Sequence, residues 1–240
     1  MIFQRRGEAS RLEAFSDATI AFVGVLLILS LDVPKSYDDL INSLYGFIPF
    51  ALTFTALLLI WVAHKNLFRR YPLSDKFTIA VNGVFLFTIL GYAYPVRLIA
   101  GSLVSAVMNG DLAVPVTPDQ LRSLFVIYGL GWMLVFFCIA TLYLHAARNA
   151  GTLGLSEIET YDAVSDGIHY LSFVVAGAIS VALAYVDVGV MFGLPAIAYC
   201  LTGLFVAGNA YVRRRNRPDS VAAALPPEPA RVVIPEAPYD

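Results

Sequence analysis

The sequence predicts an all-α integral membrane protein, and three observations support this fold class. Of the 240 residues, 58% are hydrophobic and only 14% are charged, whereas about a quarter of the residues of a soluble domain are charged. The mean hydropathy is +0.71. The hydrophobic residues form continuous runs and do not alternate with polar ones, which favours helices over the strands of a membrane barrel.

Six apolar segments are long enough to cross a bilayer, which takes about 20 residues of helix. They cover about residues 14–31, 44–64, 77–99, 121–147, 169–187 and 189–212. Only Asp187 and Val188 separate the last two, so the sequence predicts a tight turn there. We therefore expect one six-helix transmembrane domain over residues 1–216. Residues 217–240 are rich in Pro and Ala and have no helical period, so they are predicted to form a disordered tail.

Lys and Arg are distributed unevenly between the flanks of these segments. With the N-terminus inside, thirteen of the 16 fall in inner flanks, and only Lys35, Arg97 and Arg122 fall in outer ones. This bias predicts that both termini lie on the inner side, as an even number of helices requires. Residues 149–168 carry four acidic residues and no Lys or Arg, although this loop is assigned to the inner side. Acidic residues contribute little to the bias, so the orientation stands.

The first segment begins with a polar pattern. Arg11 precedes it, the triplet Phe15-Ser16-Asp17 opens it, and no residue from Ala18 to Leu31 is charged. At about 1.5 Å per residue, residues 14–31 span roughly 27 Å, which is close to the thickness of the hydrocarbon layer. Asp17 lies just inside that layer, where an ionisable side chain is costly and marks a candidate functional site.

Other polar side chains lie at a similar depth. Trp61 and His64 stand near the end of the second segment, and Asn82 stands in the third. Because polar groups at membrane depth need partners, we expect Asp17, His64 and Asn82 to form hydrogen bonds between helices. Trp61 also fits the belt of aromatic residues at a membrane interface, and for this residue both interpretations stay open.

The sequence gives catalysis little support. It contains no G-x-S-x-G or H-E-x-x-H motif and no paired carboxylates within the segments. His64, His145 and His169 are too scattered to indicate a metal site. We therefore expect no enzyme, no metal, no cofactor and no nucleic-acid partner. A secondary transporter or proton-coupled carrier that uses Asp17 or His64 remains an alternative, with no clear internal repeat to support it.

The motifs of the first three segments resemble a known family. The pattern Arg11-x-x-x-Phe15-Ser16-Asp17, followed by a Leu-rich run, is similar to the first helix of the transmembrane protein 175 potassium-channel family. Trp61-x-x-His64 resembles that family's second helix, and Asn82 lies in a similar third helix. The resemblance covers roughly residues 11–98. A single chain of six segments resembles the prokaryotic members, which are homotetramers.

The resemblance implies a potassium-type cation channel in the inner membrane of a prokaryotic cell, with monovalent cations, lipid and further copies of the chain as partners. In the family, the first helix of each subunit lines the pore, and the channel lacks the usual selectivity filter of backbone carbonyls. In agreement with this, the present sequence has no TVGYG or similar loop between its segments. The constrictions then fall on Phe22, Val25 and Leu29, and Asp32 lies at the outer mouth. The resemblance also implies a packing and hydrogen-bonding role for a set of largely polar residues, namely Arg11, Phe15, Ser16, Asp17, Trp61, His64 and Asn82.

This chain departs from the family at two of the three constrictions. Val25 stands where the prokaryotic members usually place Thr, and Phe22 replaces a typical Ile or Leu. An all-apolar stripe has no oxygen to replace lost hydration water, so we expect an apolar gate and a weak preference for potassium. A neighbouring stripe of Thr19, Phe22, Leu26 and Leu29 would instead bring a hydroxyl to the inner mouth.

Overall fold

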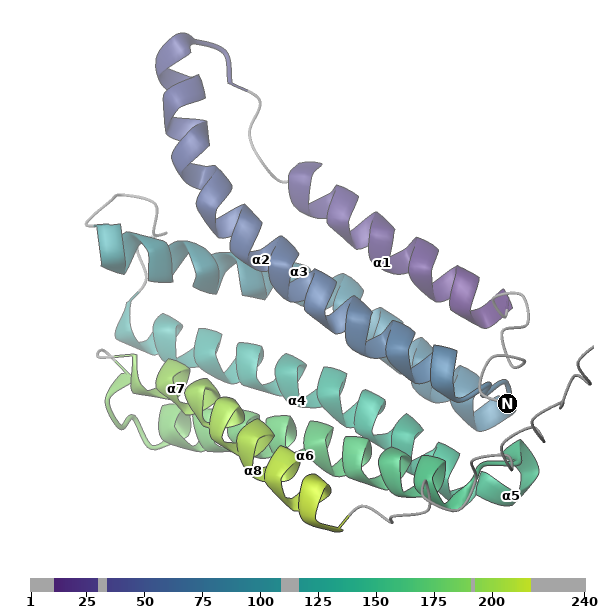
Figure 1. Ribbon diagram of the computed structural model, residues 1–240. Helices are drawn as coiled ribbons and strands as arrows, with labels where there is room; N and C mark the ends of the chain where they lie inside the picture. Colours follow the sequence, from purple (N-terminus) through teal and green to yellow (C-terminus); the bar gives the residue numbers. More distant parts are fainter. Residues whose placement is uncertain (1–10, 30–33, 109–116, 191–192, 217–240) are drawn as a thin grey trace, which may run out of the picture.

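The computed structural model describes residues 11–29, 34–108, 117–190 and 193–216 (Figure 1). Within these ranges all regular structure is helical, as the sequence predicts. The long helices are α1 (Arg11–Leu29), α2 (Tyr37–Arg70), α3 (Lys76–Met108), α4 (Pro118–Arg148) and α6 (Glu157–Tyr185). Three elements are short, namely α5 (Ala150–Leu153), α7 (Leu194–Ile197) and the 3-10 helix η3 (Ala198–Cys200). The last helix, α8 (Leu201–Asn216), is of intermediate length.

Five helical stretches in the described ranges are long and apolar enough to cross a membrane, namely Arg11–Leu29, Phe47–Arg70, Lys76–Gly101, Pro118–Arg148 and Glu157–Tyr185. They correspond to the first five predicted segments. The sixth segment differs, because its apolar helical stretch is the shorter Leu194–Asn209. Asp187, Gly189 and Gly193 have φ values of 56°, 63° and 70°, and such left-handed residues interrupt a helix. The next helix whose bounds the structure describes, α7, begins at Leu194.

The helices form a bundle in which α1 lies at one edge, next to α2 and α3, while α4, α6 and α8 lie on the other side (Figure 1). The most extensive helix pair is α4 with α6. These two approach closely at Gly129 and Gly177, where a Cβ on either residue would lie within 3.5 Å of the other's carbonyl oxygen. Small residues allow such close contact between membrane helices.

The acidic stretch that runs against the charge bias forms the start of α6. Ser156 caps this helix: its hydroxyl accepts a hydrogen bond from the Glu159 backbone N at 3.2 Å, and its own backbone N donates to Glu159 Oε2 at 2.8 Å. Carboxylates near a helix N-terminus are favoured by the helix dipole. The helix start therefore explains Glu157 and Glu159, whereas Asp162 and Asp166 lie further along α6.

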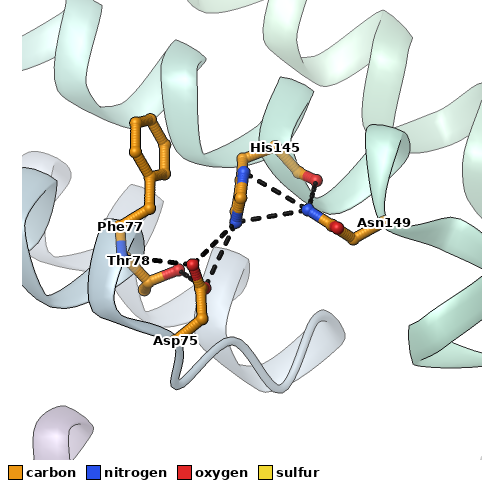
Figure 2. A network of polar contacts seen from close by, with 5 residues as sticks. All are labelled: Asp75, Phe77, Thr78, His145 and Asn149. Atoms are coloured by element: carbon orange, nitrogen blue, oxygen red, sulfur yellow. Dashed lines mark hydrogen bonds and ion pairs between the residues drawn. The ribbon is translucent and has the colours of Figure 1, made fainter.

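A polar network joins the start of α3 to the end of α4 (Figure 2). The Asp75 carboxylate accepts hydrogen bonds from the Phe77 backbone N and the Thr78 hydroxyl. His145 Nε2 lies 3.2 Å from both Asp75 oxygens, and the Asn149 side chain donates to the His145 carbonyl oxygen. The Thr78 hydrogen bond is the main cause that holds the pKa of Asp75 below its ordinary value. An ionised Asp75 then stabilises the N-terminus of α3.

Candidate pore helix and its polar anchor

The predicted constriction residues lie together on the exposed face of α1. Phe22 is 54% exposed, Val25 49% and Leu29 73%. The spacing of three and four residues puts them on one stripe of the helix. The opposite face is buried against α2 and α3 through Ser16, Ile20, Val23 and Leu27. In a single copy of the chain, this helix therefore presents a continuous apolar stripe that no other described helix covers.

The structure distinguishes this stripe from the neighbouring one that contains Thr19 and Leu26. Both of these side chains are partly buried, so they turn toward the adjacent helices. The Thr19 hydroxyl also donates to the Phe15 carbonyl oxygen at 2.9 Å, a bond within the helix. The most exposed stripe is therefore the one without a hydroxyl.

Ser16, on the buried face of α1, begins a chain of hydrogen bonds across three helices. Its hydroxyl donates to the Leu12 carbonyl oxygen at 2.8 Å and accepts a hydrogen bond from Asn82 Nδ2 of α3 at 2.8 Å. Asn82 Oδ1 lies 2.8 Å from His64 Nε2 of α2. The exposed fractions of Ser16, Asn82 and His64 are 0%, 0% and 1%. This chain of bonds ties α1, α2 and α3 together away from water.

The same bonds determine which proton His64 carries. Because Asn82 donates through Nδ2, its Oδ1 must accept, so His64 Nε2 is the donor. His64 Nδ1 is buried without a hydrogen-bond partner in the described ranges, and a proton on it would be unsatisfied. The ring packs between Phe68 and Phe85, with centroids 4.7 and 4.8 Å away. A neutral imidazole with its proton on Nε2 fits this environment.

Asp17 joins α1 to α2 through a different partner from the one expected. Its Oδ1 accepts a hydrogen bond from Trp61 Nε1 at 2.8 Å, whereas the sequence suggested His64 or Asn82. Lys65 Nζ lies over the Trp61 ring, 4.7 Å from its centroid. Trp61 thus has a specific contact besides any role at the membrane interface. We call the five residues Ser16, Asp17, Trp61, His64 and Asn82 the polar anchor.

Two residues of the predicted polar network, Arg11 and Phe15, are not brought into the polar anchor. Phe15 is 63% exposed, and Arg11 is also exposed at the first residue of α1. Neither side chain forms a hydrogen bond or ion pair with the polar anchor within the described ranges. Asp32, the predicted residue of the outer mouth, lies outside the described residues.

Sequence reasoning missed a cluster of ion pairs that joins α2, α6 and α8. Asp166 lies between two guanidinium groups, with Arg70 Nη1 2.8 Å from Oδ2 and Arg213 Nη1 2.8 Å from Oδ1. Arg213 also pairs with Asp162 at 2.7 Å. The signal was present, because Asp162 and Asp166 are four residues apart and therefore share a helix face. The choice of their partners depends on how the helices pack.

Comparison with known proteins identifies the family. Residues 11–92 match the family model described as "Endosomal/lysosomal potassium channel TMEM175", and this range includes the apolar stripe and the whole polar anchor. A curated protein of Marivirga tractuosa, named "Potassium channel", is 32% identical over 195 residues, which are 77% of this chain and 78% of that protein. The chain belongs to the TMEM175 family.

Further relatives agree with this assignment. A second curated potassium channel, from Chamaesiphon minutus, is 26% identical over 79% of this TMEM175-family chain and 92% of its own length. The crystal structure of a variant of the potassium channel MtTMEM175 superposes with a TM-score of 0.77 at 28% identity, over 88% of this chain and 96% of that one. A TMEM175 homologue from Chamaesiphon minutus has a TM-score of 0.58 at 21% identity, over 84% and 98%, and supports the fold alone.

Proposed function

We propose that this TMEM175-family chain is one of four identical subunits of a potassium channel, and that α1 of each subunit lines the pore. The observation that carries the proposal is the exposed apolar stripe of Phe22, Val25 and Leu29. Four such stripes around a common axis make a narrow apolar constriction. Water leaves a constriction of this kind readily, so it acts as a gate.

The polar anchor supports the proposal because it helps to hold the rotation of α1. Successive residues of a helix are about 100° apart, so Ser16 and Ala18 point in nearly opposite directions. With Ser16 bonded to Asn82 inside the bundle, Ala18 and the stripe that follows it must face outward. The bond from Trp61 to Asp17 fixes the helix from a second direction. These hydrogen bonds, together with the packing of the buried face of α1, hold the rotation of the proposed pore helix.

A secondary transporter that uses Asp17 or His64 is not favoured. Such a site needs a side chain that is accessible to an ion or proton and able to change its partner. His64 is 1% exposed and packed between two aromatic rings, and the Asp17 carboxylate already accepts a hydrogen bond from the Trp61 indole N–H. Both residues are therefore arranged for packing between helices.

The proposed function is tested by reconstituting the purified chain into a planar bilayer under a potassium gradient. We expect discrete single-channel currents that reverse toward the potassium equilibrium potential. Val25→Trp should abolish them, because four indoles would fill the constriction. Val175→Trp is the matched control, since Val175 on α6 is also 49% exposed, and it should keep the current. Equal currents from the two variants would show that α1 does not line the ion path.

We further propose that both termini lie on the inner side of a prokaryotic inner membrane. This orientation rests on the bias of thirteen inner to three outer basic residues among the 16 in the chain. In a variant without Cys138 and Cys200, a single Cys at Tyr37 should react with an impermeant maleimide added to intact cells. A Cys at Ser74 should react only after permeabilisation, and both positions are exposed. Labelling of the Ser74 position from outside would reverse the orientation.

A further inference from the structure

A cavity of about 470 Å³ opens between α2, α4, α6 and α8. It lies at the end of the bundle where α2 and α8 finish and α6 begins (Figure 1). Its wall is rich in hydrogen-bond donors, which include the side chains of Asn66, Arg69, Arg70, His169, Asn209 and Arg213. Asp166 is the one carboxylate that lines it in the described part of the chain.

The charges around this cavity leave one cation in excess. Asp166 is shared by Arg70 and Arg213, and Arg213 also pairs with Asp162. Two carboxylates therefore balance two guanidinium groups. Arg69 lines the same cavity and forms no ion pair within the described ranges. Each guanidinium carries five N–H groups, so the paired arginines also keep donors for a further acceptor.

The neutral side chains add to this preference for an acceptor. The His169 ring packs edge-on against Tyr170 and Phe173, with centroids 5.0 and 5.2 Å away, and its nitrogens form no hydrogen bond in the described ranges. Asn209 Nδ2 donates to the Ser165 carbonyl oxygen at 3.1 Å, which holds α8 against α6 beside the cavity. These contacts hold α8 and the His169 ring in place, and the hydrogen-bond donors of the cavity wall remain available to a ligand.

We propose that this cavity binds a phosphate-bearing anion, supplied by the headgroup of an anionic lipid of the inner leaflet. The position of the cavity along the membrane normal fits a lipid headgroup. Two of the residues that line it, Arg70 and Asn209, are the last residues of apolar helical stretches. Arginine guanidinium groups match the geometry of phosphate oxygens, and basic pockets between membrane helices on the inner side hold such headgroups. A bound headgroup would bridge α2 to α8.

The proposal is tested on the full chain purified in neutral detergent, with thermal unfolding followed by tryptophan fluorescence. Short-chain phosphatidylglycerol should raise the unfolding midpoint, and phosphatidylcholine of the same chain length should not. Arg69→Gln should weaken the apparent affinity for phosphatidylglycerol about fivefold, since it removes the unpaired charge. Arg148→Gln is the matched control, because Arg148 is exposed at the end of α4 and does not line the cavity.

The same measurement with inorganic phosphate in place of lipid distinguishes a lipid headgroup from a soluble phosphate as the source of the anion. If inorganic phosphate stabilises the chain as well as the lipid does, and Arg69→Gln weakens that effect, the site is supported and its ligand is a soluble phosphate. Equal stabilisation by the two lipids, or equal losses in Arg69→Gln and Arg148→Gln, would overturn the proposal. Arg69→Gln breaks no ion pair of the described ranges, so we expect this variant to fold and to unfold at the native midpoint without added lipid. The measurement needs no current and therefore does not depend on the proposed potassium conduction.

Discussion

Asn82→Leu should strongly reduce both the thermal stability of the chain and the yield of the proposed tetramer from detergent. The leucine side chain has the same branched arrangement of four heavy atoms, but it removes both hydrogen bonds of the buried amide, to Ser16 and to His64. A hydrogen bond between membrane helices contributes about 0.6 to 2 kcal/mol. Losing two should therefore shift the folding equilibrium roughly tenfold or more. His64 Nε2–H would in addition be left buried without an acceptor.

Thr88→Val on the same helix is the matched control for this variant. This substitution removes a single hydrogen bond, and that bond lies within α3, from the Thr88 hydroxyl to the Val84 carbonyl oxygen at 2.7 Å. We expect nearly native melting and assembly, measured by thermal unfolding and by light scattering after size exclusion. If Asn82→Leu behaves like Thr88→Val but alters ion selectivity, Asn82 belongs to the ion path and the face assigned to α1 is wrong.

Val25→Thr should sharpen the preference for potassium over sodium, because four hydroxyls would partly replace the hydration oxygens that an ion loses in the constriction. With its native apolar stripe, the channel should show small or rare currents and a weak preference. Phe22→Ser should raise the conductance by admitting water. The measurement is the reversal potential with potassium on one side and sodium on the other, together with the single-channel current.

Leu26→Thr is the control for the choice of stripe. Leu26 is partly buried beside the exposed face, so a hydroxyl there should leave selectivity unchanged. A selectivity change in Leu26→Thr but not in Val25→Thr would mean that α1 is rotated toward the neighbouring stripe in the assembled channel. Strong potassium selectivity in the native channel, with no effect of Val25→Thr, would place the filter elsewhere. The expected ring of Asp32 at the outer mouth stays a prediction.

The sequence by itself determined the helical membrane fold, the first five candidate spans and the family. Hydrophobicity and helical period are local properties, so a run such as residues 14–31 predicts a membrane helix whatever surrounds it. The spacing of three and four also places Phe22, Val25 and Leu29 on one face, but only the packing of α1 distinguished this stripe from the neighbouring one with Thr19 and Leu26. The motifs around Asp17 and His64 likewise sufficed for the family resemblance.

Only the tertiary structure decided which polar groups meet. The sequence placed Asp17, His64 and Asn82 at one depth, but the relative rotation of the helices paired Asp17 with Trp61 and Asn82 with Ser16. Rotation is set by the packing of many side chains at once, so it is not encoded in any one segment. For the same reason, the ion-pair cluster of α2, α6 and α8 and the cavity beside it became visible only when residues 96 and 47 positions apart lay side by side.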